Sequence, residues 1–85
     1  MFLARVYITF KPGINDPVGQ TVRGSLHQLR FKNVHDVRIG KYIQLYLDET
    51  LKEEAAATVR EMCDTLLANP VIEDYRFELE NVDDC

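Results

Sequence analysis

The sequence has little of what several specialised protein classes need. Among its 85 residues there is no tryptophan and there are only two cysteines, and 10 Lys and Arg stand against 14 Asp and Glu, for a net charge of −4. Phosphate binding needs clustered Lys and Arg, so this balance argues against nucleic acid or an anionic membrane surface as a partner. No apolar run approaches the roughly 20 residues that span a bilayer.

The two cysteines and the start of the chain bear on the compartment. Cys63 falls within a predicted helix and Cys85 is the last residue, so we expect no structural disulfide. The chain goes straight into a strand, without the basic and apolar regions of a signal peptide, which predicts a cytoplasmic protein. The length predicts one domain over residues 1–80 with a single core, followed by an acidic, frayed tail over 81–85.

The first 30 residues set the organisation of the chain. Apolar and other residues alternate with a period of two over 2–10, which predicts a strand. Its second face is also largely apolar or aromatic, so we expect a central strand. A Pro-Gly pair at 12–13 ends it, because proline donates no ladder hydrogen bond and glycine adopts positive φ. Asn15 or Asp16 is expected to cap a helix over Pro17–Leu29.

The rest of the chain predicts three further strands and a second helix. Thr50 and Glu53 have the spacing of a capping box, which predicts a helix start. The expected elements are a strand over 34–39, a hairpin turn at 40–41, a strand over 42–48, a helix over 51–68 and a strand over 71–80.

This β-α-β-β-α-β order is typical of the ferredoxin-like α+β two-layer sandwich, in which two helices cover one face of an antiparallel sheet. In that topology the turn after the first strand and the hairpin at 40–41 lie at opposite ends of the sheet. The uncovered face would carry Leu3, Tyr7, Tyr42 and Tyr46. Exposed apolar patches usually mark association, so we expect a homodimer or tetramer, with Leu3, Tyr7 and Tyr46 as self-association candidates.

Residues that could carry catalysis or bind a metal are few. His27 and His35 have no cysteine or carboxylate at metal-ligand spacing, and we expect both to be surface histidines. Cys63 has apolar neighbours and is expected to be a small buried hydrophobe. Gly13 and Gly19 are too few and wrongly spaced for a phosphate-binding loop. The sequence therefore predicts no catalytic, cofactor or metal site in this chain.

Four segments stand out as motifs: Lys11-Pro12-Gly13, Asp16-Pro17-Val18-Gly19, the segment from Val37 to Tyr42 and the segment from Leu67 to Tyr75. In this order they resemble the PurS family, the small subunit of phosphoribosylformylglycinamidine (FGAM) synthase. The resemblance covers the chain to about Glu80. The sequence departs from the family at Arg30, where the family usually has glycine. The end of the first helix must therefore be built without glycine.

The resemblance implies a part in the fourth step of purine (IMP) biosynthesis. In that family a PurQ glutaminase subunit releases ammonia, and a PurL subunit that uses ATP and Mg converts formylglycinamide ribonucleotide to the amidine. This chain would bridge the two and hold no catalytic group or cofactor. The subunit-docking candidates are the motif residues Lys11, Asp16, Arg38, Lys41 and Tyr42. Arg38 stands out because guanidinium binds a carboxylate or phosphate with two parallel bonds.

Three other function classes remain open at this point. An ACT-like regulatory module would bind a small ligand at a dimer interface near the turn after the first strand, through the backbone amides of 13–16. A small ferredoxin-like dimeric enzyme would need His27 or His35 as acid or base. An RNA-binding module of similar topology fits less well, because the expected strand over 42–48 lacks its aromatic and basic signature.

Overall fold

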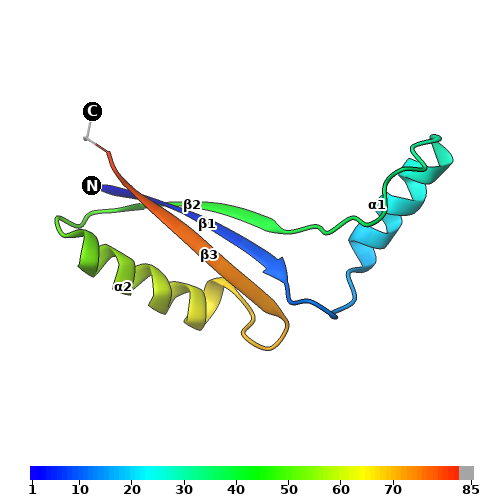
Figure 1. Ribbon diagram of the computed structural model, residues 1–85. Helices are drawn as coiled ribbons and strands as arrows, with labels where there is room; N and C mark the ends of the chain where they lie inside the picture. Colours follow the sequence, from blue (N-terminus) through cyan, green and yellow to red (C-terminus); the bar gives the residue numbers. More distant parts are fainter. Residues whose placement is uncertain (83–85) are drawn as a thin grey trace.

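The computed structural model describes residues 1–82, and a three-stranded antiparallel sheet is its main feature (Figure 1). The elements follow in the order β1 (Phe2–Phe10), α1 (Pro17–Gln28), β2 (Lys41–Leu47), α2 (Lys52–Met62), a π-helical segment η1 (Cys63–Leu67) and β3 (Glu73–Asn81). The strand order is β2-β1-β3, so the prediction that the first strand is central is confirmed. Within the described residues, none of the helices is long and apolar enough to cross a membrane.

The core lies between the sheet and α2, which confirms an α+β fold with an antiparallel sheet. Every second side chain of β1 points into this core, as expected for a strand with a period of two. The buried residues of the core are Phe2, Ala4, Val6, Ile8, Leu47, Ala55, Val59, Cys63 and Ala68. Tyr75, Phe77 and Leu79 of β3 pack against them from the same face of the sheet.

The predicted strand over 34–39 is wrong: the segment forms an irregular connection along α1, and the sheet has three strands. Side chains of α1 bind its backbone where a strand would pair. Arg23 Nε donates to the His35 carbonyl at 2.9 Å, and His27 Nε2 lies 2.8 Å from the Val34 carbonyl oxygen. The expected hairpin at 40–41 is therefore also absent from the described residues, and the chain enters β2 directly from this connection.

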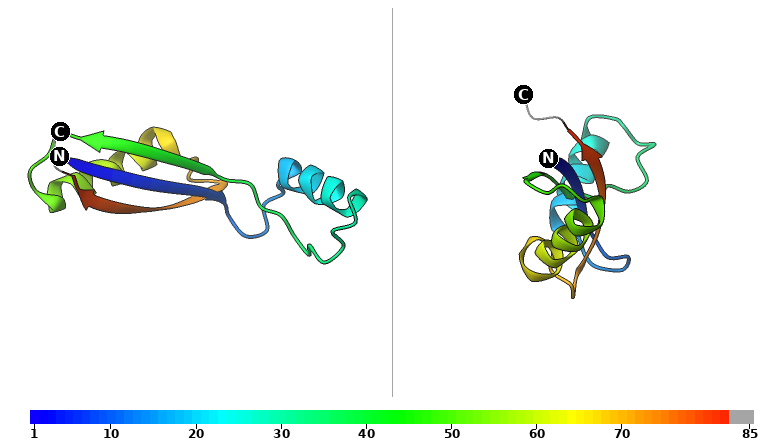
Figure 2. Two further views of the ribbon diagram at one scale, coloured as in Figure 1. Left: turned by 90° about the horizontal axis from the view of Figure 1, so that it is seen from above. Right: turned by 90° about the vertical axis from the view of Figure 1, so that its left-hand side faces the viewer.

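The expectation that two helices cover one face of the sheet is also wrong, because only α2 does so. Helix α1 projects beyond the end of the sheet, as Figures 1 and 2 show from different sides. Apolar side chains at the two ends of α1 are accordingly open: Val18 is 59% exposed, and Leu29, which directly follows the helix, is 67% exposed. Because the sheet has no fourth strand, no sheet surface lies beside α1. The irregular connection over 34–39 lies along α1 instead.

Both ends of α1 agree with the sequence. Asp16 caps α1 and Pro17 is its first residue, as predicted. At the other end Arg30 adopts φ +77°, its amide donates to His27 O, and Phe31 N donates to Leu26 O. These two bonds form a Schellman motif, with arginine at the position that favours glycine.

The start of α2 differs from the sequence expectation. The residue that precedes the helix is Leu51, not Thr50, and it makes no side-chain capping bond. Because the helix begins one residue later than the capping box requires, Thr50 lies outside the capping position. The acidic first turn with Glu53 and Glu54 still complements the helix dipole.

Residues 81 and 82, which were predicted to belong to a frayed tail, pair with the start of β1. Asn81 pairs with Phe2 as the last residue of β3, and the Val82 amide donates to the Met1 carbonyl at 3.0 Å. Residues 83–85, and with them Cys85, lie outside the described residues.

Candidate functional site

The five docking candidates lie together at one end of the sheet, and we call them the sheet-end cluster: Lys11, Asp16, Arg38, Lys41 and Tyr42. The expectation that 12–13 and 40–41 lie at opposite ends is wrong. Ile8 of β1 pairs with Lys41 of β2, so β1 ends where β2 begins. The loss of the predicted strand over 34–39 brings the two segments to the same end.

Asp16 is buried at the base of this cluster, with an exposed fraction of 1%. Its Oδ1 accepts from the Gly19 amide at 2.9 Å and its Oδ2 from the Ile39 amide at 2.7 Å. The bond from Ile39 is the main cause that lowers the pKa of Asp16, followed by the bond from Gly19, and the charge of Arg38 adds to both. Both carboxylate oxygens are thus occupied within the chain.

Arg38 binds backbone rather than another charged side chain. Its Nη1 donates to the Ile14 carbonyl at 3.1 Å and its Nη2 to the Lys11 carbonyl at 3.2 Å. The fork of the guanidinium therefore fixes the loop between β1 and α1 against the connection over 34–39. Arg38 and Asp16 together shape the loop that presents the rest of the cluster.

Lys11, Lys41 and Tyr42 present the exposed groups of the cluster. Lys11 Nζ lies 3.3 Å from Asp74 and Lys41 Nζ lies 3.6 Å from Glu73, both at the start of β3. The Lys11 pair is a surface ion pair, which contributes little to stability. In the second pair Lys41 is exposed, whereas the Glu73 side chain is 13% exposed and also accepts from the Asn69 amide. The Tyr42 ring is exposed on the face opposite α2.

Gly19 and Gly40 are needed for this arrangement, although the sequence pointed to Gly40 only as part of a predicted hairpin turn and to Gly19 only as part of a PurS-like motif. A Cβ atom on Gly19 would lie 2.3 Å from the Val37 carbonyl oxygen, and one on Gly40 would lie 2.5 Å from the Ile8 carbonyl oxygen. Both positions let two backbone segments approach closely. By contrast, nothing lies within 4 Å of a Cβ on Gly24.

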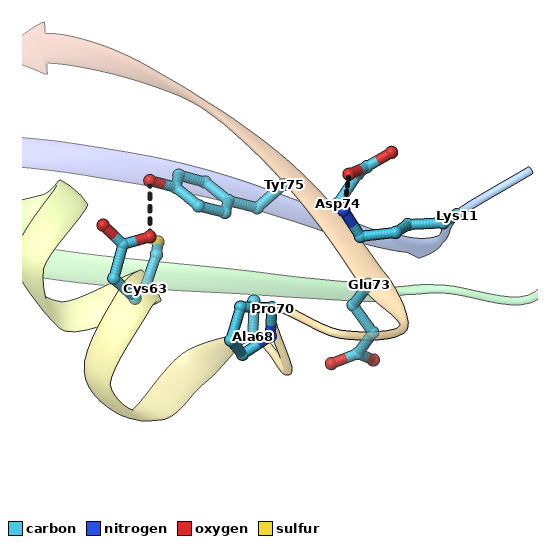
Figure 3. Close-up of a pocket in the computed structure, with 8 residues that line it drawn as sticks. Lys11, Cys63, Ala68, Pro70, Glu73, Asp74 and Tyr75 are labelled. Carbon is cyan, nitrogen blue, oxygen red and sulfur yellow. Dashed lines mark hydrogen bonds and ion pairs between the residues drawn. The ribbon is translucent and has the colours of Figure 1, made fainter.

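A small pocket lies beside the cluster, between η1 and the start of β3 (Figure 3). Its volume is ≈ 160 Å³, and the side chains of Lys11, Cys63 and Tyr75 line it. Burial raises the pKa of the Cys63 thiol, which favours the unreactive protonated form, and confirms the prediction of a buried small side chain. Tyr75 donates to Asp64 at 3.1 Å across the pocket.

The histidines are placed away from this pocket, on α1 and in the connection that follows it. His27 binds the Val34 carbonyl and so helps to hold that connection, while His35 is exposed. Among the described residues, no group of three or more His, Cys, Asp or Glu side chains could hold a metal ion.

The face of the sheet opposite α2 carries the self-association candidates, and we call Leu3, Tyr7 and Tyr46 the open-face patch. Tyr46 is 65% exposed, Tyr7 is half-buried, and Leu3 is already buried between its neighbours Tyr46 and Glu80. Tyr7 is enclosed by its own sheet, because Tyr42 lies 5.2 Å away between ring centroids and Arg76 lies 4.1 Å over the ring. Desolvation, and then the hydrogen bond from Tyr7 to Glu78, raise the pKa of Tyr7.

The comparison with protein families decides between the function classes. The family model "PurS: Phosphoribosylformylglycinamidine (FGAM) synthase" matches residues 3–81. The chain belongs to the PurS family. Curated PurS subunits of FGAM synthase include that of Bacillus subtilis, 44% identical over 82 residues and 96% of each chain. That of a Synechocystis species is 47% identical over 75 residues, which cover 88% of this chain and 75% of the relative.

Solved PurS structures share the fold of this PurS chain. PurS of Bacillus subtilis has a TM-score of 0.86 at 44% identity and covers 95% of this chain and 100% of its own. PurS of Methanocaldococcus jannaschii, described as a subunit of formylglycinamide ribonucleotide amidotransferase, has a TM-score of 0.87 at 40% identity, with 98% and 100% covered. A chain of PurLQS from Thermotoga maritima has a TM-score of 0.83 at 28% identity, with 94% and 99% covered. These relatives favour the FGAM synthase subunit over a ligand-binding regulatory module.

Proposed function

We propose that this chain is the non-catalytic small subunit of FGAM synthase and bridges a PurQ-type glutaminase and a PurL-type synthetase. The observation that carries the proposal is the match to PurS over 3–81, together with the likeness to a chain of the Thermotoga maritima PurLQS structure along almost its whole length. The reaction belongs to purine biosynthesis in the cytoplasm.

In this proposal both chemical reactions take place in the partner subunits. Glutamine hydrolysis in the PurQ-type subunit supplies ammonia, and the PurL-type subunit binds ATP and Mg and replaces the amide oxygen of formylglycinamide ribonucleotide by nitrogen. This chain positions the other two subunits and keeps water from the path of ammonia. The states of its own reactive side chains support a structural role, since Cys63 is a buried thiol and His27 is bound to backbone.

The sheet-end cluster is the proposed docking surface for the PurL-type subunit. Asp16 and Arg38 fix the shape of this surface, because their polar atoms bind backbone groups of the loop and the connection. Lys11, Lys41 and Tyr42 make the contacts, since Lys41 and Tyr42 are exposed and Lys11 is partly exposed, whereas the exposed guanidinium of Arg38 is engaged by two backbone carbonyls. A rigid loop that presents exposed groups is a common form of recognition site.

The open-face patch is proposed as a contact between copies of this chain, which gives a homodimer or, with a second interface, a tetramer. Tyr46 supports this role because a large aromatic side chain with 65% of its surface exposed gains much from burial. A second copy can present the same aromatic surface in return, as symmetric dimers do.

Reconstitution tests the bridging role. The tagged chain is mixed with the PurL-type and PurQ-type chains of the same organism, and the masses are measured by size-exclusion chromatography with light scattering. The proposal predicts one peak that contains all three chains and is lost when this chain is omitted. A PurL–PurQ complex that forms equally well without this chain, while this chain elutes alone, would refute the bridging role.

A further inference from the structure

The chain between η1 and β3 is a tightly bonded turn, and we call it the β3-entry loop: Asn69, Pro70, Val71 and Ile72. The Asn69 side-chain oxygen accepts from the Val71 amide at 3.0 Å, and the Asn69 amide donates to Glu73 Oε1 at 2.8 Å. The Asn69 carbonyl accepts from the Ile72 amide at 3.2 Å and from the Glu73 amide at 2.7 Å. Pro70 has a fixed φ and no amide proton. Every backbone amide of the loop therefore has a partner, and the loop is rigid.

The β3-entry loop is also fixed to the neighbouring strands. The Lys11 amide donates to the Ile72 carbonyl at 2.9 Å. Directly after the loop, Glu73 lies 3.6 Å from Lys41 Nζ and Asp74 lies 3.3 Å from Lys11 Nζ. Figure 1 shows the loop at the end of the sheet where β1 ends and β2 begins. The loop and the sheet-end cluster are therefore parts of one continuous surface.

Val71 is the large apolar side chain that this loop exposes. It is 77% exposed, whereas Ile72, the next residue, is partly buried. The bonds that hold the loop use the side chains of Asn69 and Glu73 and not that of Val71. The fold would therefore accept a polar side chain at this position equally well.

The properties of Val71 suit a contact with another protein. Valine is branched at Cβ, so its side chain has little rotamer freedom to lose. Its backbone is already held by the bonds of the loop, so binding costs little ordering entropy. Because burial of its methyl groups removes apolar surface from water, this side chain favours association.

The sheet-end cluster lacks such an apolar group at its centre. Two of its five members bind backbone within the chain, which leaves Lys11, Lys41 and Tyr42 for contacts. A stable interface buries about 800 Å² on each partner and has an apolar core inside a polar rim. Three side chains, two of them charged, do not supply that area or that core. The adjacent β3-entry loop extends the surface and adds Val71 beside the ion pairs.

We propose that the β3-entry loop is a second docking element for the PurL-type subunit, and that Val71 enters an apolar pocket on that subunit. The occupant follows from the proposed function, on which this inference rests. A partner that contacts Lys11 and Lys41 also covers the loop, because the acidic residues paired with these lysines directly follow it. The receiving surface is apolar where it meets Val71 and polar around it, to match the ion pairs.

Calorimetric titration of the full chain with the PurL-type subunit measures the contribution of Val71. Val71→Thr keeps the branched Cβ and replaces a methyl group by a hydroxyl, and Val71→Asp introduces a charge. The affinity should fall about tenfold for Val71→Thr and about a hundredfold for Val71→Asp, because a polar or charged group is buried without a partner. Val71→Ile keeps an apolar, branched side chain and should bind nearly as the wild type does.

Thr50→Asp is the matched control for charge. Thr50 is exposed and follows the end of β2, at the opposite end of the sheet, so this variant should bind with wild-type affinity. Salt separates the apolar contact from the ion pairs. The loss caused by Val71→Thr should be the same at low and high salt, whereas the loss caused by Lys41→Ala should shrink as salt screens the charges.

Thermal unfolding checks that each variant folds, and the exposed position of Val71 predicts unchanged melting temperatures. If Val71→Asp does unfold the chain, Val71→Thr decides, because it preserves the shape of the side chain. A wild-type chain that does not bind the PurL-type subunit would refute the proposed docking and this inference together. Wild-type binding that both polar variants retain would overturn the inference alone. So would variants that bind the PurL-type subunit normally but lose the PurQ-type subunit or self-association in size-exclusion chromatography with light scattering.

Discussion

The carboxylate of Asp16 and the backbone amide of Ile39 are joined by a 2.7 Å hydrogen bond that closes the segment containing α1. The two residues are 23 positions apart, one directly before α1 and the other two residues before β2. Because the same carboxylate also binds the Gly19 amide, one side chain fixes both the start of the helix and the return of the chain.

Asp16→Asn should lower the melting temperature at neutral pH. Asparagine caps a helix about as well as aspartate, so the Gly19 bond survives, but its amide group faces the Ile39 amide when its oxygen binds Gly19. Asp36→Asn is the matched control, since Asp36 is exposed and binds only the adjacent Val37 amide. Thermal unfolding followed by circular dichroism measures both, and equal losses in the two variants would contradict the clamp.

The same bond predicts how stability depends on pH. The pKa of Asp16 is lowered in the folded chain, so its contribution is complete above the ordinary value of about 3.9 and is lost as the pH falls through the folded value. The difference in melting temperature between wild type and Asp16→Asn should therefore shrink below about pH 4. A difference that stays constant or grows in acid would be inconsistent with this carboxylate's role.

Arg30→Gly should stabilise the chain by about 1 kcal/mol, because a side chain at positive φ costs that much and glycine does not. Gly13→Ala provides the opposite change, since Gly13 adopts φ +84° with nothing within 4 Å of an added Cβ. It should destabilise by a similar amount through backbone strain alone. Urea denaturation measures both, and an unchanged or lower midpoint for Arg30→Gly would contradict the strain at this helix end.

The parts of the fold that depend on local sequence were predictable. The central strand followed from alternation over 2–10, and the start of α1 followed from Asp16 and Pro17. The prediction of a strand over 34–39 was wrong, because its β-branched residues do not show whether another strand is available to pair with it. Side chains of Arg23 and His27 bind its carbonyls, and only the three-dimensional arrangement brings them there.

The members of the sheet-end cluster could be selected from the sequence, but their arrangement could not. The PurS-like motifs selected Lys11, Asp16, Arg38, Lys41 and Tyr42, but their gathering at one end depends on the antiparallel register of β1 and β2. Asp16 and Arg38 bind backbone groups of their own chain. These contacts depend on distances in space that a linear sequence does not contain.

Two variants of the sheet-end cluster distinguish a residue that contacts the partner from one that holds the loop in shape. They are Lys41→Ala and Arg38→Ala. Lys41→Ala should leave the melting temperature nearly unchanged, because the Lys41 side chain is exposed and Glu73 keeps its bond from the Asn69 amide. It should weaken binding to the PurL-type subunit by about 1 to 3 kcal/mol. Arg38→Ala should weaken binding and also lower the melting temperature, since two carbonyls lose their donor.

Arg38→Lys is the control for Arg38, because lysine keeps the charge but cannot reproduce the two-pronged contact. It should resemble Arg38→Ala in stability. Calorimetric titration with the PurL-type subunit and thermal unfolding provide the two readouts. Binding of Lys41→Ala at wild-type strength would remove Lys41 from the docking surface.

Tyr46→Glu should weaken the proposed open-face contact, because a carboxylate buried there without a partner costs several kcal/mol. Tyr46→Phe is the matched control and should associate nearly as wild type, since it keeps the ring. Sedimentation equilibrium measures both. If Tyr46→Glu assembles as wild type does, the open-face patch is not a contact between copies.

The most direct test of the central claim compares two nitrogen sources in the reconstituted synthase. Formation of FGAM is measured with glutamine and, separately, with ammonium chloride, each with and without this chain. A bridging subunit without catalytic groups should be required with glutamine and dispensable with ammonia, and Lys41→Ala should reduce only the glutamine-dependent rate. Equal loss of both rates when the chain is omitted, or no loss of either, would contradict the account.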